Sequence, residues 1–407
     1  MKKVFLVTKL KTTNLGNQAL SMELIKLFEQ NVGKENLYVG GRPLGLFGYS
    51  INKLRSSSDP VALFESWADA VIKKYTPMKA SSNVFKSRVN DFDLTANKSL
   101  KVEQFKVWLR PLKRAFDKLF LFNKQYVKRL NAINACDVFI YSGAGEVSDN
   151  HVFLRQMLEI RIAQKLGKMT GAANQSVVVR DDAFKKIVKL VYGNMNQVVV
   201  RGNISRDTII AAGVPKEKVI VAPDTAIKTD PGTILTKNGK VGINFTPFIK
   251  FDYKDVALIV DKLREYNREI VFVTNEPLGD VPIMQKFKAN YNIDVLENAV
   301  DYLDFAKKVS AFEYIVGARL HANVMALAVN VPVIAIEGLV WKTKELFDQF
   351  EYPLPSVNVN DEGWVDSVLE SIDKIENRKV DFNNYFKNTL VKHKDDVRNN
   401  VAWINKN

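Results

Sequence analysis

The chain has little cysteine, little histidine and no long apolar run. Cys136 is the only cysteine among 407 residues, so no internal disulfide can form, and the three histidines lack the spacing of a metal site. No stretch approaches the ~18 apolar residues of a membrane span. The apolar run Val4–Val7 is too short for the core of a signal peptide. We therefore expect a cytoplasmic protein without a bound metal.

Positive charge is what the chain has in excess. There are 59 Lys and Arg residues against 45 Asp and Glu, a formal net charge of +14. Such an excess suits an anionic partner, which can be nucleic acid, anionic lipid or a phosphorylated substrate. The length and the 46% hydrophobic content suit two domains.

Short, continuous apolar runs alternate with helical patterns along the chain. Continuous runs are typical of strands buried on both faces, as in a parallel sheet covered by helices. A first series lies at Val4–Thr8, Leu37–Gly40, Asp137–Gly143, Met169–Asn174, Gln197–Arg201 and Val219–Asp224. A second series lies at Lys240–Phe245, Glu269–Asn275, Asp294–Glu297, Tyr314–Arg319 and Val331–Glu337. Two series predict two doubly wound α/β domains.

We expect the domains to cover residues 1–228 and 237–407, because Thr225–Lys240 carries turn residues and no periodicity. The segment from Asn384 to Trp403 has a helical pattern and either closes the second domain or crosses back to the first. Residues 45–130 interrupt the strand–helix rhythm of the first domain as a helical, basic insert.

The end of this insert, Phe105–Leu130, combines an apolar stripe at helical spacing with many basic residues, and Pro111 predicts a break in it. Two interpretations stay open. The stripe packs on the first domain and leaves a solvated basic face, or it lies in a membrane interface with its basic residues on anionic lipid.

Candidate site residues follow strand ends, where α/β proteins bind ligands. The loop Thr12–Asn17 offers Asn14, Gly16 and Asn17 before a helix that we expect to begin near Gln18. The turn Tyr141–Asn150 offers Gly143 and Gly145 for close backbone approach and Glu146 and Asp149 as acid–base groups. The first loop can equally be a plain turn, and loop carboxylates such as those of the second are more often solvated than catalytic.

Four further candidates carry, or can carry, charge. Arg201 ends a predicted strand and suits an anion, and Asp224 lies at the expected domain boundary. The most specific segment is Tyr314–Ile336, in which Arg319 and His321 lie between a buried strand and a small-residue helix. The helix dipole, free N–H groups, a guanidinium and an imidazole would meet there, which predicts an anion site.

This last segment resembles the polysaccharide pyruvyl transferase family, whose hallmark is Arg-(Leu/Tyr)-His, a small-residue helix and a Val-Pro-Val-Ile strand. Other family features occur in the family's order. They are Asn14–Asn17, Gly143–Glu146, Val198–Ser205, Pro223–Asp224 and Trp341–Lys344. The resemblance covers the chain except for residues 45–130. It implies a GT-B-like architecture, with the acceptor on the first domain and the donor on the second.

The chain departs from the family pattern at two places. Ala144 replaces the middle residue of a Gly-Gly-Gly turn, and Asn174–Val179 keeps only Gln175 and Ser176 of Gly-Gln-Ser-Ile-Gly-Pro. These departures leave open a different acceptor or a diverged activity.

The resemblance implies transfer of pyruvate from phosphoenolpyruvate, as a ketal, to a sugar of a bacterial surface glycan or its lipid-linked precursor. No cofactor and no nucleic acid is then required. The resemblance implies that Arg201, Arg319, His321 and Lys344 bind the donor. It implies that the acceptor is bound by Asn14, Gly16, Asn17, Gly143, Gly145 and Gln175. Catalysis would then involve His321, with Glu146, Asp149 or Asp224 as the base. The alternative is a GT-B-type glycosyltransferase that uses a nucleotide-sugar donor.

Overall fold

The computed structural model describes residues 1–9, 12–41, 49–75, 122–143, 146–338 and 340–405. They form two units, each built around its own parallel sheet. Unit 1 comprises Met1–Lys11, Ile25–Ala222 and Arg398–Asn407, and unit 2 comprises Thr12–Leu24 and Pro223–Val397. Helix α1 (Leu15–Val32) therefore begins in unit 2 and continues in unit 1.

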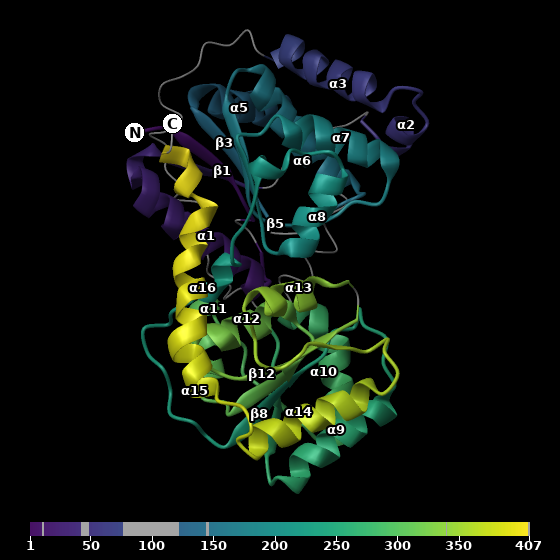
Figure 1. Cartoon of the computed structure of the whole chain (residues 1–407), viewed down its shortest axis with the longest axis vertical. Helices are drawn as coiled ribbons and strands as arrows, with labels where there is room; N and C mark the ends of the chain where they lie inside the picture. The colour runs from purple at the N-terminus through teal and green to yellow at the C-terminus, as the bar shows by residue number, and fades with distance from the viewer. Residues whose placement is uncertain (10–11, 42–48, 76–121, 144–145, 339, 406–407) are drawn as a thin grey trace. The chain divides into compact units, whose positions relative to one another are not determined.

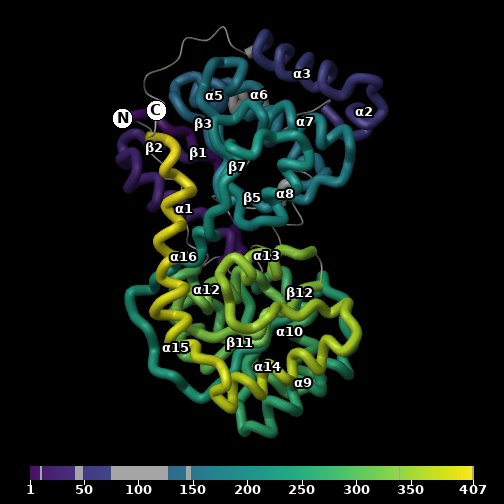
Figure 2. Tube along the Cα trace, viewed as in Figure 1, coloured from purple at the N-terminus to yellow at the C-terminus, as the bar shows by residue number. Residues whose placement is uncertain are grey.

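These units are interleaved in the sequence, whereas the sequence pattern predicts a single division near residues 228–237. The C-terminal residues belong to unit 1: a Cβ at Gly171 would collide with the ring of Trp403, and Lys2 Nζ donates to Ile404 O over 2.9 Å. Figure 2 shows the two chain ends close together in this unit. Of the two possibilities left open for the C-terminal segment, the structure shows the return to the first domain for Arg398 onward.

Unit 1 contains a seven-stranded sheet in the order β2-β1-β3-β5-β6-β7, with β4 paired to β5. All its pairs are parallel. The strands are β1 Val4–Val7, β2 Leu37–Gly40, β3 Val138–Ser142, β4 Glu146–Ser148, β5 Met169–Val178, β6 Gln197–Val200 and β7 Val219–Val221. Because β1 lies between β2 and β3, the chain changes direction at β1, and ligands bind at such switch points in doubly wound sheets.

The helices of unit 1 cover this sheet. They are α2 Ile51–Arg55, α3 Pro60–Tyr75, α5 Phe122–Ala135, α6 His151–Lys165, α7 Asp182–Gly193 and α8 Asn203–Ala211, besides α1. Helices α3, α5, α6 and α7 gather on one face (Figure 1), where Phe64 and Phe184 share a core with Phe5 and Phe139 of the strands.

Two expectations for unit 1 need correction. Strand β5 does not end at Asn174 but runs to Val178, because Asn174 adopts a left-handed conformation (φ 59°) and absorbs a register shift against β6. In the insert, Arg129 of α5 is not a solvated basic residue, since its guanidinium forms a buried ion pair with Glu159 over 2.9 Å. The expected break at Pro111 and most of the apolar stripe lie outside the described residues.

Unit 2 contains a six-stranded parallel sheet in the order β10-β9-β8-β11-β12-β13. The strands are β8 Lys240–Asn244, β9 Glu269–Phe272, β10 Asp294–Val295, β11 Tyr314–Gly317, β12 Val333–Glu337 and β13 Val357–Asn358. The switch point lies between β8 and β11, the central pair. Both sheets confirm the predicted doubly wound α/β architecture.

The helices of unit 2 lie on both faces of this sheet. They are α9 Tyr253–Glu265, α10 Pro277–Tyr291, α11 Tyr302–Val309, α12 Leu320–Ala328, α13 Lys342–Gln349, α14 Trp364–Glu376, α15 Phe382–Asn384 and α16 Leu390–Asp396. Helices α9, α10 and α14 share one core with alternate strand residues such as Ile243 and Val316. Figure 1 shows α12 on the opposite side of β8 and β12 from α9 and α14.

Candidate functional site

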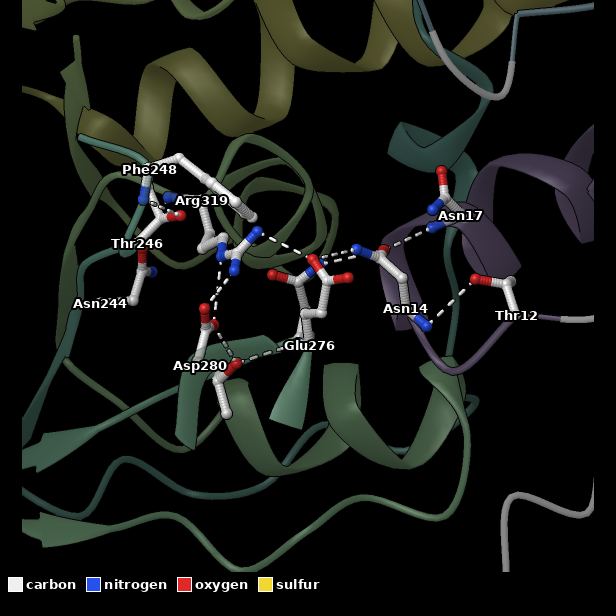
Figure 3. Close-up of polar contacts among 11 residues, drawn as sticks. Thr12, Asn14, Asn17, Asn244, Thr246, Phe248, Glu276, Asp280 and Arg319 are labelled. Atoms are coloured by element: carbon white, nitrogen blue, oxygen red, sulfur yellow. Dashed lines mark hydrogen bonds and ion pairs between the residues drawn. The ribbon is translucent and has the colours of Figure 1, made fainter. Parts of the chain in front are cut away.

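Three helices of unit 2 begin beside the switch point of its sheet. Helix α1 begins at Leu15, α10 at Pro277 and α12 at Leu320. Their first turns are joined by the side chains of Asn14, Glu276 and Arg319, as Figure 3 shows. Because each helix start carries a partial positive charge, this arrangement favours an anion.

Arg319 lies at the centre of this group. Its Nε donates to Asp280 Oδ2 over 3.1 Å, its Nη2 pairs with the other oxygen of Asp280, and its Nη1 donates to Glu276 Oε2 over 2.9 Å (Figure 3). The guanidinium carbon also lies 5.7 Å from the ring centroid of Phe248, an exposed aromatic side chain. The predicted anion-binding arginine is thus held by two carboxylates.

Asp280 is the fixed partner of this arginine. Its side chain is fully buried, and Thr274 Oγ1 donates to Asp280 Oδ2 over 2.5 Å. Burial raises the pKa of Asp280, and the hydrogen bond and charge of Arg319 oppose that rise. Breaking the pair would leave a buried charge uncompensated, so Asp280 holds Arg319 in place.

The backbone before Arg319 is held by buried amides. Asn244, at the end of β8, accepts from the Arg319 backbone N–H over 2.7 Å, and Asn323 of α12 donates to Gly317 O over 2.8 Å. A Cβ at Gly317 would lie 2.6 Å from the Asn244 amide nitrogen. The glycine therefore makes room for the amides that orient the arginine.

His321 lies in the first turn of α12 against the start of α1. A Cβ at Gly16 would lie 2.7 Å from His321 Cγ and 2.9 Å from Nδ1, so the glycine is required for this contact. The imidazole Nε2 is buried without a hydrogen-bond partner among the described residues, and lies 3.6 Å from Asp224 Oδ2.

The expected base Asp224 is itself fully buried. Its Oδ1 accepts from the Ala226 backbone N–H over 2.9 Å and caps the turn Thr225–Lys228. The structure thus places Asp224 beside His321.

Asn14 and Asn17 lie at the start of α1. Asn14 Oδ1 accepts from the Asn17 backbone N–H over 3.0 Å, which makes Asn14 the N-cap, and its Nδ2 donates to Glu276 Oε2 over 2.9 Å. The helix begins at Leu15 because of this cap, three residues before the expected start near Gln18.

Lys344 belongs to a different contact in the same unit. Its Nζ lies 2.5 Å from Asp348 Oδ2 in a solvated pair on α13, while its backbone N–H donates to Glu337 over 2.8 Å. Burial raises the pKa of the Glu337 carboxyl, which the backbone of Thr343 and Lys344 partly offsets. The ammonium group of Lys344 is thus paired with Asp348 at the protein surface.

In unit 1, Arg201 follows the end of β6, and Gln175 lies within β5, where it pairs with Val200. Arg201 is buried, and its Nε and Nη2 donate to Ser176 Oγ over 2.9 and 2.6 Å. Gln175 donates from Nε2 to Tyr141 O over 3.2 Å, while its buried Oε1 has no hydrogen-bond partner among the described residues. The structure brings these two predicted residues together.

The other unit 1 candidates have structural contacts or remain undescribed. A Cβ at Gly143 would lie 2.7 Å from Gln175 Cα, so this glycine permits close packing of two strands. Asp149 Oδ2 accepts from the backbone N–H groups of Arg180 and Asp181 over 2.9 and 3.1 Å. Gly145 and the side chain of Glu146 lie outside the described parts of the structure.

Sequence reasoning missed Glu276, Asp280, Asn244 and Asn323. Asn244 ends strand β8 and Glu276 follows β9, so the rule that selected Arg201 and Arg319 could have found both. Asp280 and Asn323 lie inside helices and carry no comparable signal. In the described part of the chain, no group of three or more His, Cys, Asp or Glu side chains could hold a metal ion.

Two doubly wound units, with polar and charged residues at the carboxyl ends of their strands, define a GT-B-like α/β protein. The family model of polysaccharide pyruvyl transferases matches residues 14–338, which include every candidate site residue except Lys344. Because the match covers most of the chain, the protein belongs to the polysaccharide pyruvyl transferase family, and it is a transferase.

Solved structures confirm the fold. The UDP-GlcNAc 2-epimerase of Neisseria meningitidis, bound to UDP-GlcNAc, is 14% identical with a TM-score of 0.52, over 99% of this chain and 100% of the epimerase. A protein of Listeria monocytogenes assigned as a UDP-N-acetylglucosamine 2-epimerase is 12% identical with a TM-score of 0.53, over 99% of this chain and 96% of that one. At these identities the likeness shows the GT-B fold alone. No curated protein shows significant sequence similarity.

Proposed function

We propose that the protein transfers pyruvate from phosphoenolpyruvate to a sugar, as a ketal, with its donor site in unit 2. The observation that supports this most is the junction of three helix starts with Arg319 and His321. It offers an anionic donor a guanidinium, an imidazole and backbone N–H groups in one place. Family membership supports the same reaction class.

The reaction needs an anion site and a proton donor. Carbon 3 of the enol takes a proton, and carbon 2, left electron-poor, takes two sugar hydroxyl oxygens while its bond to the phosphate oxygen breaks. Of the two hydroxyl protons, one balances the proton given to carbon 3 and the other leaves with phosphate. In this proposal Arg319 holds the carboxylate or phosphate, and His321, whose buried Nε2 lacks a hydrogen-bond partner in the described chain, exchanges the proton.

For unit 1 we propose an acceptor role. Gln175 has a free amide oxygen that can accept from a sugar hydroxyl, and Arg201 beside it suits an anionic group. Among the candidate bases, Asp149 already accepts two backbone N–H groups and Asp224 is fully buried.

The test supplies the purified full chain with sugar acceptors and either phosphoenolpyruvate or UDP-sugars. We expect phosphate release from phosphoenolpyruvate only, and an acceptor heavier by one pyruvate less one water. The same rate is expected with a chelator, since the arginines supply the positive charge. Turnover with a UDP-sugar alone would instead establish the glycosyltransferase alternative, and a chelator-sensitive reaction would refute the metal-free mechanism.

We further propose that the protein works in the cytoplasm, at the inner face of the membrane, on a lipid-linked acceptor. In the described residues, none of the helices has the length and apolar character needed to cross a bilayer. The basic segment 105–130 is the candidate contact with anionic lipid, since each Lys or Arg near such a surface adds about 1 kcal/mol.

A further inference from the structure

One side of the Arg319 guanidinium is bound to the buried Asp280, and the other side is bound to the partly exposed Glu276. Five N–H groups are available on an arginine, and the paired contacts of Nε and Nη2 with Asp280 use two of them. The end formed by Nη1 and the second N–H of Nη2 points away from Asp280. A carboxylate or phosphate binds an arginine in a paired geometry at such an end.

Glu276 lies at this end. Its Oε2 accepts from Arg319 Nη1 and from Asn14 Nδ2, each over 2.9 Å, so one carboxylate oxygen joins α1, α10 and α12 (Figure 3). The Glu276 side chain is 31% exposed, whereas that of Asp280 is 0% exposed. Glu276 is also the N-cap residue of α10 without a capping hydrogen bond from its side chain. The Glu276 carboxylate can therefore turn into solvent, provided that an incoming anion takes its place on Arg319 Nη1 and Asn14 Nδ2, whereas the buried carboxylate of Asp280 cannot turn out.

We propose that Glu276 is an internal competitor of the anionic donor: its carboxylate occupies the donor's place on Arg319 and Asn14, and a carboxylate or phosphate of the donor displaces it. This inference rests on the proposed function for the identity of the donor, but not for the anion site itself. Asp280 holds the Arg319 guanidinium in the same orientation before and after this exchange.

The charges show what such a competitor does. Asp280, Glu276 and Arg319 together carry one net negative charge when both carboxyls are ionised, and this charge opposes an approaching anion. Once Glu276 turns away, Arg319 and Asp280 are neutral together, and the positive helix starts can attract the anion. The affinity for any anion is then lower than a free arginine would give. In the proposed reaction this also helps the product phosphate to leave, because Glu276 returns to Arg319 as phosphate dissociates.

The experiment measures anion binding by isothermal titration calorimetry in a phosphate-free buffer, with inorganic phosphate and with phosphoenolpyruvate as separate probes. The test variant is Glu276→Gln, which keeps the shape and the hydrogen bond from Asn14 but removes the charge. The matched control is Glu265→Gln. Glu265 ends α9, and helix ends in such units lie at the opposite edge of the sheet from the site. Its carboxylate is exposed, 3.5 Å from Lys262.

We expect Glu276→Gln to bind both probes roughly tenfold more tightly than the wild type, which is the effect of one charge-assisted hydrogen bond. Glu265→Gln should bind them as the wild type does. Adding Arg319→Lys to Glu276→Gln should abolish the gain, since lysine cannot offer the paired geometry. In turnover assays Glu276→Gln should lower the KM for the donor and strengthen inhibition by phosphate.

Three results would overturn the inference. Weaker binding in Glu276→Gln would mean that Glu276 only orients Arg319. Unchanged binding with a large fall in kcat would make Glu276 a general base. No binding of either probe to any of the proteins would remove the anion site. The proposed function fails separately: tighter phosphate binding in Glu276→Gln without any pyruvyl transfer would refute that function and leave the competitor in place.

Discussion

Gly16 offers a sharp test of the site geometry, because two physical effects predict opposite results for Gly16→Ala. Alanine in place of a helical glycine ordinarily stabilises a protein by ~0.5–1 kcal/mol. Here the added Cβ would lie 2.7 Å from His321 Cγ, 2.9 Å from Nδ1 and closer still to the His321 Cβ. Carbon atoms prefer to be about 3.5–4.0 Å apart, so α1 and α12 would have to separate by about 1 Å.

The clash should outweigh the propensity gain. Rotating the imidazole does not relieve the contact with the His321 Cβ, which is fixed to the α12 backbone. Overpacking of this kind costs about 1–3 kcal/mol, which leaves a net loss of up to about 2.5 kcal/mol and a fall of up to several degrees in Tm. A catalytic group displaced by about 1 Å can lose roughly 100-fold in rate.

The assay compares thermal unfolding and kcat/KM for the wild type, Gly16→Ala and Gly193→Ala. Gly193 is the last residue of α7, and no atom lies within 4 Å of a Cβ placed there. We expect Gly193→Ala to keep or raise Tm and to keep activity. If Gly16→Ala behaves in the same way, His321 does not lie against α1 as described, and the reasoning is refuted.

Three further predictions concern other parts of the chain. Burial lowers the pKa of His393 below its ordinary 6.5, so the contribution of this side chain to stability is present above about pH 6.5 and is lost as the pH falls. Between about pH 7 and 5, the Tm of His393→Gln should therefore fall less than the Tm of the wild type. An equal fall in the Tm of both proteins would contradict this. Arg201→Lys, which loses the two bonds to Ser176, should raise the KM for an anionic acceptor roughly tenfold and leave the donor KM unchanged. A raised donor KM with an unchanged acceptor KM would contradict this and return Arg201 to the donor binding that the family resemblance implies. The protein should sediment with anionic liposomes at low salt but not at high salt. Replacing Lys113, Arg114 and Lys118 with glutamate should abolish this sedimentation. Equal binding to neutral liposomes would exclude the electrostatic contact.

The fold was predictable because its strands are buried on both faces. Continuous apolar runs such as Val4–Val7 and Tyr314–Gly317 identify central parallel strands without knowledge of their neighbours. Strands β4 and β13 were not predicted, because two or three residues within polar loops carry no periodic signal. The assignment of Thr12–Leu24 to unit 2 depends on tertiary contacts that no local pattern reports.

The site was predictable in position but not in its partners. The dipole and strand-end arguments selected Arg319 and His321, and the structure places both beside the switch point of the unit 2 sheet. That two carboxylates hold Arg319 was not predictable, since Asp280 looks like any acidic residue in a first helical turn. Lys344 stays a prediction: the family motif selected it as a donor-binding residue, and the structure shows its ammonium group in a solvated pair with Asp348.

The most direct test of the central claim is mass spectrometry of the surface glycan from cells that carry the wild-type protein, no protein, or Arg319→Lys. We predict a repeat unit heavier by one pyruvate less one water in the wild type, and its loss or strong reduction in the other two. The same glycan mass in all three cells would contradict both the pyruvyl transfer and the role of Arg319 in it.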